Sequence, residues 1–130
     1  MSQTVADIAE YIRSLLAQDL APRSEARAFR ALIQCADNLR GHRGESLITL
    51  CVQEPAPTGD ARFDAAMAAV VEHFFTEQGL PAPTWVDQPK RFLLTPWISD
   101  PYAPADIVEL SSASFVRHGV LLARSELASL

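Results

Sequence analysis

The fold of this chain is decided by PAPTGDARFDAAMAAVVEHFFTEQGLPAPTWVDQPKRFLLTPW, which runs from Pro55 to Trp97. Asp60 is expected to cap a helix over Ala61–Gln78, because its side chain can accept hydrogen bonds from the free N–H groups of the first turn. Gly79 suits the end of this helix, since glycine adopts the left-handed conformation at little cost. The apolar residues recur at helical spacing and line one broad face: Phe63, Ala66, Met67, Val70, Val71, Phe74 and Phe75.

A proline-rich segment follows this helix. Its prolines are Pro81, Pro83, Pro89, Pro96, Pro101 and Pro104. Each proline removes a backbone donor and restricts the residue before it, so long regular structure is excluded. A short helix is expected at about Pro89–Leu94, with irregular chain elsewhere. The segment also carries apolar rings, Trp85, Phe92, Trp97 and Tyr102, and we therefore expect an ordered loop that packs over the helices.

Two helices are expected before this stretch. Thr4 predicts the N-cap of the first, which should end near Gln18 because the Ala21-Pro22 step disfavours continuation. Ser24 predicts the N-cap of the second, and Gly41 its end. Their apolar stripes are Ile8, Tyr11, Ile12, Leu15 and Leu16 for the first, and Ala28, Phe29, Leu32, Ile33, Ala36 and Leu39 for the second.

The remaining segments predict short elements. ESLITLCV, Glu45–Val52, contains residues typical of strands but lies between helices, so both structures stay open and the helix is adopted. The C-terminal expectations are helices at Ala105–Leu110 and Ser112–Arg117, a stop at Gly119, an extended piece at Val120–Leu122, and a final turn capped by Ser125. The pattern predicts an all-α protein, a compact single-domain helical bundle over residues 1–130 with a long central helix and a proline-rich aromatic loop.

The charge is acidic and unevenly distributed. The chain of 130 residues has a formal net charge of −5. Residues 1–43 contain six arginines against five acids, whereas residues 44–130 contain five basic residues against eleven acids. This balance argues against nucleic-acid binding as the default function. The acidic part suits a basic protein partner, although a solvated acidic surface is the simpler interpretation.

Two cysteines, Cys35 and Cys51, lie in apolar segments. The N-terminal sequence lacks the basic and apolar regions of a signal peptide, and no apolar run approaches the ~20 residues of a membrane span. We therefore expect a cytoplasmic protein with two reduced, packed thiols and no membrane association. There is no Cys-x-x-Cys pair and the histidines are scattered, so no metal site is expected.

No catalytic motif is evident. The chain lacks a phosphate-binding glycine loop and a Gly-x-Ser-x-Gly elbow. Glu72 and His73 lack the second histidine of a zinc helix, so His73 is interpreted as a residue at the boundary of the apolar face. The pairs Asp60/Asp64 and Glu72/Glu77 are interpreted as solvated surface carboxylates. No enzyme activity, catalytic residue or cofactor is expected, and a small enzyme with an unrecognised pocket stays an alternative.

A helix-turn-helix is a second alternative for residues 23–52. The second predicted helix, the RGHRG turn and Glu45–Val52 would form it, and six arginines lie in this part of the chain. However, the five acids nearly cancel their charge, and Glu45–Val52 contains no Arg, Lys, Asn or Gln to read base edges. Direct nucleic-acid binding is therefore not expected, and a dimeric DNA-binding regulator is kept as the alternative function.

The aromatic loop allows two interpretations. In the structural one, Trp85, Phe92 and Trp97 cover the helical core, which we favour for at least two of the three. In the functional one, the loop forms a docking site for a protein partner with Arg91 and Arg117 at its edge, because Trp, Tyr and Arg are enriched at binding hot spots. These five residues are the predicted partner-binding set.

The motifs of this chain resemble those of a family of small bacterial proteins. That family has a Pro-Pro-Thr-Gly-Asp turn, an alanine-rich helix, Gly-Leu-Pro-x-Pro-x-Trp, Pro-x-x-Phe-Leu and a terminal Phe-Arg-Arg-x-Gly-Val/Ile. The corresponding segments here are Pro57–Asp60, Ala61–Gln78, Gly79–Trp85, Pro89–Leu93 and Phe115–Val120, with a looser match at Ala28–Arg40. At Val116-Arg117-His118 only one of the two usual arginines is present.

The resemblance implies a partner. Proteins of this family are often paired with a nucleotidyltransferase-like protein in toxin–antitoxin or phage-defence modules, and some carry an additional N-terminal helix-turn-helix that is not seen here. It therefore implies an antitoxin or regulatory partner of a nucleotidyltransferase-like toxin, with a homodimer possible. An acidic surface on such a protein would occlude a basic cleft of the toxin.

Overall fold

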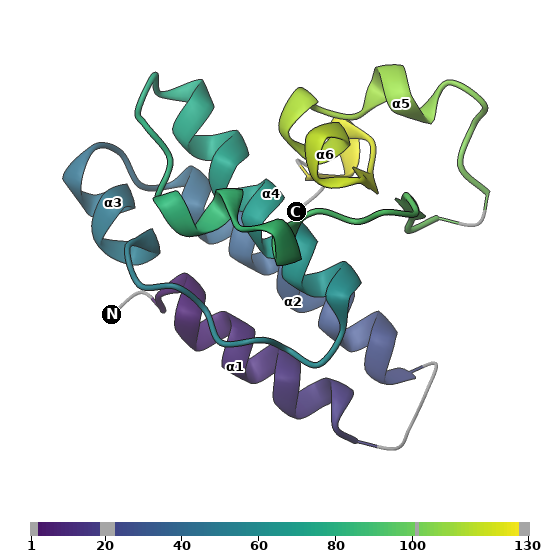
Figure 1. Ribbon diagram of the computed structural model, residues 1–130, viewed down its shortest axis with the longest axis horizontal. Coiled ribbons are helices and arrows are strands. Elements are labelled where there is room, and N and C mark those ends of the chain that lie inside the picture. Colours follow the sequence, from purple (N-terminus) through teal and green to yellow (C-terminus); the bar gives the residue numbers. More distant parts are fainter. Residues whose placement is uncertain (1–2, 19–22, 101, 128–130) are drawn as a thin grey trace.

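The computed structural model describes residues 3–18, 23–100 and 102–127, and most of them are helical (Figure 1). This confirms the all-α class and the compact single domain. In chain order the elements are α1 (Val5–Leu16), α2 (Arg23–Arg40), α3 (Glu45–Cys51), α4 (Ala61–Glu77), the 3₁₀ turns η1 (Thr84–Asp87) and η2 (Pro89–Arg91), β1 (Trp97–Ile98), α5 (Ile107–Leu110), α6 (Ala113–His118), β2 (Val120–Leu121) and α7 (Arg124–Leu127).

Helix α4 lies at the centre of the molecule. All seven residues of its predicted apolar face are buried, but so are Ala65, Ala68 and Ala69 on other sides. Helix α2 packs against α4, and η1, η2 and α6 also pack against it. The alanines have short side chains, which leave room for neighbours on several sides. The helix is therefore enclosed more completely than one broad face predicts.

Both ends of α4 follow the sequence expectation. Asp60 is the N-cap, and its Oδ1 accepts a hydrogen bond from the Arg62 N–H at 2.9 Å. At the other end Gly79 has φ of 66°, and the N–H of Leu80 donates to the carbonyl of Phe75 at 2.9 Å. This is the backbone pattern of a helix terminated by a left-handed glycine. The local side-chain chemistry therefore sets the length of the central helix.

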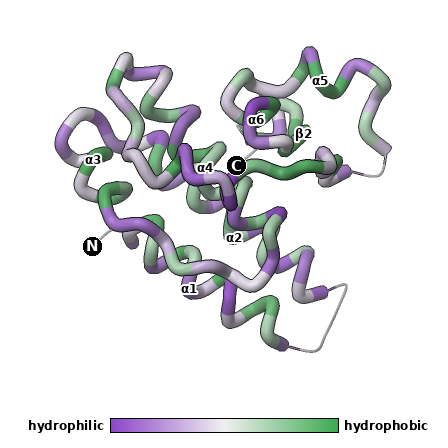
Figure 2. Tube along the Cα trace, viewed as in Figure 1, coloured by the Kyte–Doolittle hydropathy of each residue, from purple (hydrophilic) through white to green (hydrophobic). Residues whose placement is uncertain are grey.

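Helices α1 and α2 form a hairpin, along which polar and apolar residues alternate (Figure 2). Thr4 caps α1 together with Asp7, each side chain accepting from the other's N–H at 3.1 Å. The predicted stripe of α1 is wrong at Tyr11, which is 53% exposed. The Ala21-Pro22 step lies outside the described residues.

Two predicted N-caps are wrong. Helix α2 begins at Arg23, so Ser24 lies inside it, and the Ser24 hydroxyl donates to the carbonyl of Gln18 at 3.0 Å. Ser125 lies inside α7 for the same reason, since that helix begins at Arg124. A serine within the first turn has the same sequence signature as a capping serine, and only its hydroxyl partner separates the two.

The ambiguous segment is a helix. Residues Leu47, Leu50 and Cys51 of α3 are buried at helical spacing, which decides between helix and strand. Cys35 and Cys51 are free and buried, as expected. Burial raises the pKa of the Cys51 thiol to about 12, so this thiol stays protonated and unreactive at neutral pH.

Residues 92–100 and 102–127, here named the C-terminal lobe, contain short elements at the upper right of Figure 1. The extended piece after Gly119 is confirmed as β2, which pairs in parallel with an unpredicted strand, Trp97 opposite Val120. The predicted helices appear as α5 and α6, and Ser112 caps α6. The helix expected at 89–94 is instead the 3₁₀ turn η2, because Phe92 is already extended.

We predict that Gly79→Ala lowers the free energy of unfolding by about 1 kcal/mol, because alanine is strained in the left-handed conformation. A Cβ at this position meets no atom within 4 Å, so only backbone strain is tested. Gly41→Ala is the matched control, since its φ is not positive, and it should change stability little. Urea unfolding followed by circular dichroism measures both, and equal losses would contradict the assignment.

Candidate functional site

A buried arginine holds the start of α4. Only 1% of Arg91 is exposed. Its guanidinium donates to the carbonyls of Asp64, at 3.1 Å, and Pro55, at 2.9 Å. It lies 4.9 Å from the ring centroid of Trp85 and 3.6 Å from the carboxylate of Glu54. Its Nε has no hydrogen-bond partner among the described residues. Arg91 therefore fixes the loop before α4 against the helix.

Trp85 belongs to the same interior. It is buried, and its indole Nε1 donates to the carbonyl of Cys51 at 2.9 Å. Two of the five residues predicted to bind a partner, Trp85 and Arg91, thus act inside the protein in this structure. The structural interpretation is confirmed for Trp85, which is buried, and for Trp97, which is partly buried and packs against the hydrophobic core.

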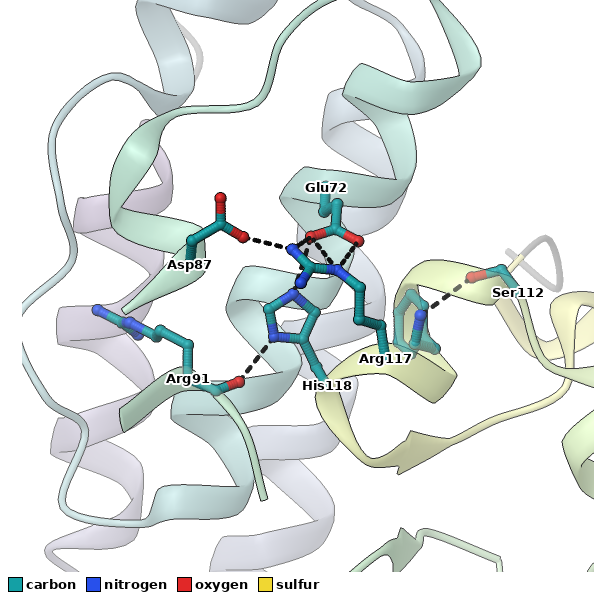
Figure 3. A network of polar contacts seen from close by, with 7 residues as sticks. Glu72, Asp87, Arg91, Ser112, Arg117 and His118 are labelled. Carbon is teal, nitrogen blue, oxygen red and sulfur yellow. Dashed lines mark hydrogen bonds and ion pairs between the residues drawn. The ribbon is translucent and has the colours of Figure 1, made fainter. Parts of the chain in front are cut away.

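A polar network joins α4 to the end of α6 (Figure 3). His118 is completely buried, with Nδ1 2.7 Å from the carbonyl oxygen of Arg91 and Nε2 3.0 Å from Oε1 of Glu72. Both neighbours are acceptors, so a ring nitrogen that carries a proton donates to the acceptor beside it. Glu72 also accepts from Arg117, at Nη2 (2.6 Å) and Nε (3.1 Å). Arg117 pairs in turn with Asp87.

Opposing effects act on the Glu72 carboxyl. Burial by itself would raise its pKa, but the hydrogen bonds from Arg117 and His118 and their positive charges outweigh burial. The pKa of Glu72 is consequently held below its ordinary value of 4.5. The carboxylate is thus ionised at neutral pH and gains part of its interaction energy only in the folded protein.

The aromatic residues of the loop differ in their surroundings. Phe92 is partly buried and stacks on the His118 ring, with centroids 4.4 Å apart, while the Arg117 guanidinium lies 5.0 Å from the Phe92 ring centroid. Trp97 is also partly buried but packs elsewhere, against Phe63 at 5.2 Å. The structure therefore brings Arg91, Phe92 and Arg117 into one network and leaves Trp97 outside it.

Sequence reasoning missed two members of this network. Glu72 was interpreted as a solvated carboxylate and His118 as one of several scattered histidines, yet both are buried. The sequence does indicate burial of Glu72, because this residue lies between Val71 and Phe74 on the apolar side of α4. A carboxylate at such a position must be paired. His73 is at the boundary, as expected, with its Nε2 3.5 Å from Glu77.

The surface of the C-terminal lobe is apolar at several places. Leu94 is fully exposed and Tyr102 is 91% exposed. We name as the lobe surface the exposed large apolar residues of this region: Leu94, Ile98, Tyr102, Val108, Leu110 and Val116. In Figure 2 the chain that enters the lobe is coloured as hydrophobic. Residues 92–116 contain three acids and no Lys or Arg, while Arg117 follows Val116 and the Arg124 side chain donates to the carbonyls of Glu109 and Ser111.

The helix-turn-helix alternative has the expected order of elements, with α2, a turn and α3 in succession. Helix α3, ESLITLC, contains no Arg, Lys, Asn or Gln, and its exposed face includes Glu45 and Ile48. A recognition helix reads bases with such side chains, so the structure adds no support for base reading by α3.

Within the described ranges no cluster of three His, Cys, Asp or Glu side chains is placed to hold a metal ion. None of the helices in those ranges has the length and apolar character needed to cross a membrane. No family model, curated protein or solved structure matches this chain.

We predict that Glu72→Gln destabilises the protein in a pH-dependent way. Because the pKa of Glu72 is lowered on folding, its contribution is complete above the ordinary value of 4.5 and is lost as the pH falls through the lowered pKa. The free energy of unfolding of the variant should be lower than that of wild type by on the order of 3 kcal/mol near neutral pH. This difference should shrink in acid. Urea unfolding across this pH range measures it.

The control for this experiment is Glu109→Gln, which removes an exposed carboxylate of α5. It should change stability little at any pH. If the loss of unfolding free energy in Glu72→Gln stays constant from neutral to acidic pH, the role assigned to the ionised carboxylate is contradicted.

Proposed function

We propose that this protein is a non-enzymatic interaction protein that acts by protein–protein binding, as the antitoxin or regulatory partner of a nucleotidyltransferase-like toxin. The observation that carries the proposal is the lobe surface. Exposed large side chains such as Leu94 and Tyr102 are stabilised when a partner removes them from water. Tyrosine in particular is enriched at the centres of protein interfaces.

The three acids of residues 92–116 support a basic partner. Asp100, Asp106 and Glu109 lie in the same stretch, which has no positive side chain between Arg91 and Arg117. A nucleotidyltransferase binds nucleotide phosphates and nucleic acid, and such clefts are positively charged. The lobe would then occlude the cleft, with charge complementarity steering association and apolar contacts holding the complex. The nucleotidyltransferase class itself comes from the motif resemblance.

The five predicted contact residues take two roles in this proposal. Phe92, Trp97 and Arg117 are partly accessible and border the lobe surface. Arg91 supports the lobe, because its carbonyl accepts from His118 at the end of α6, and Trp85 packs against the Arg91 guanidinium. In this interpretation the family-like motifs hold the lobe in place, while less distinctive residues such as Leu94 and Tyr102 contact the partner.

The proposal is tested by capture of the partner with a tagged chain from the cells in which it is native. Leu94→Ser combined with Tyr102→Ser should lose most of the captured nucleotidyltransferase-like protein, because two exposed apolar contacts of the lobe surface are removed. Wild type should retain it in stoichiometric amount.

The matched control combines Ile48→Ser and Val52→Ser, which remove two exposed apolar side chains of the α3 region. This variant should capture as much partner as wild type. Equal capture by the lobe variant, or the absence of a stoichiometric partner with wild type, would contradict the proposal. Light scattering of the purified chain reports whether a second copy covers the lobe surface instead.

A further inference from the structure

Three arginines form a row along the outer face of α2. Arg23, Arg27 and Arg30 are spaced by four and three residues, which places their side chains on one side of the helix. All three are exposed, and none of their side chains has a hydrogen bond or an ion pair with a residue in the described ranges. Gln34 continues the row one turn further on. The row spans about 10 Å, given the helical rise of 1.5 Å per residue.

Three of the five acids of residues 1–43 bind partners away from the row, while Glu10 is exposed on α1 and Asp19 lies outside the described residues. Glu25 pairs with Arg62, and Asp37 pairs with Arg40 at 2.6 Å. Asp7 accepts from the backbone N–H of Thr4 in the α1 cap. The near-neutral balance of residues 1–43 therefore conceals a local excess of positive charge on α2. Charge arrangement in space, rather than the count, decides whether a polyanion is attracted.

An aromatic ring lies beside this row. Tyr11 of α1 is 53% exposed and lines a groove of about 260 Å³ with Arg27, Arg30, Ala31 and Gln34. A second depression of about 410 Å³ continues along α2 and is lined by Arg23, Ala26, Arg27 and Arg30. The two share the middle arginines. Together they form one surface, here named the α1–α2 groove, with guanidinium groups along it and a tyrosine ring at one end.

We propose that the α1–α2 groove binds single-stranded nucleic acid. Guanidinium groups form paired hydrogen bonds with phosphate oxygens, so the arginine row suits a phosphodiester backbone. Tyr11 offers a face on which an unpaired base stacks, and the Gln34 amide can donate to and accept from a base edge. A positive groove combined with an exposed aromatic ring is the recurring arrangement for single strands. A duplex would keep its bases stacked internally and leave Tyr11 unused.

This site is separate from the lobe surface. It lies on the α1–α2 hairpin at the lower side of Figure 1, whereas α5 and the rest of the lobe lie at the upper right. The proposal therefore does not depend on the partner proposed above. It also differs from the helix-turn-helix alternative, because it uses the outer face of α2 and Tyr11 rather than α3.

The test is fluorescence anisotropy with labelled oligo(U) and oligo(dT) of about 12 nucleotides, and a duplex of the same length. Three phosphate contacts give a slope of about −2 in log affinity against log salt, so affinity should fall about 20-fold for a fourfold rise in salt. Single strands should bind more tightly than the duplex. Tighter binding of the duplex, or no saturable binding at low salt, would overturn the proposal.

Variants locate the binding site. Arg27→Gln combined with Arg30→Gln should leave one phosphate contact. The affinity of this variant should then fall only about threefold for the same fourfold rise in salt. The control combines Arg13→Gln and Arg43→Gln, which remove two other exposed arginines that have no partner in the described ranges. It should retain most of the affinity. Equal losses in both variants would mean that only net charge matters and would overturn the proposal.

The role of Tyr11 is tested by Tyr11→Ala. Loss of one stacking contact should weaken single-strand binding by about fivefold to 100-fold without changing the salt slope. Unchanged affinity would overturn the stacking arrangement. Polyglutamate tests whether the groove binds an acidic protein segment instead of nucleic acid. If it displaces the labelled oligonucleotide completely at equal charge concentration, the assignment to nucleic acid is overturned. Thermal melts confirm that each variant is folded.

Discussion

The position of the C-terminal half depends on the pairing of the buried Glu72 carboxylate with Arg117 and His118. A carboxylate in the interior is unfavourable unless charged or polar groups are paired with it, and here Arg117 and His118 are those groups. Both come from the end of α6, whereas Glu72 belongs to α4. His118 also binds the carbonyl of Arg91, whose side chain reaches back to Pro55. One network therefore fixes three distant segments of the chain relative to one another.

In this arrangement the buried, distinctive residues and the exposed apolar residues are different parts of the sequence. The most distinctive residues, including Trp85 and Arg91, lie in the interior, and the carbonyl of Arg91 accepts a hydrogen bond from His118 of the lobe. The exposed apolar residues of the lobe, such as Leu94 and Tyr102, have no distinctive sequence pattern. The α1–α2 groove has the opposite charge and is available to a different kind of ligand.

The predictable features are those fixed by local chemistry. Asp60 and Gly79 delimit α4 because capping and left-handed backbone depend on neighbouring atoms alone. Features that depend on distant segments were missed. Burial of Glu72 requires two donors that lie 45 and 46 residues away. Exposure of Tyr11 depends on how α2 crosses α1, since helical spacing alone places it with the core.

The central claim, that this protein restrains a nucleotidyltransferase-like toxin through its lobe surface, is tested most directly by the activity of that partner. The measurement is transfer of a labelled nucleotide to RNA by the purified partner, with and without an equimolar amount of this protein. Wild type should suppress most of the transfer, and the Leu94→Ser, Tyr102→Ser variant should not. Transfer that continues unchanged in the presence of the wild-type protein would contradict the account.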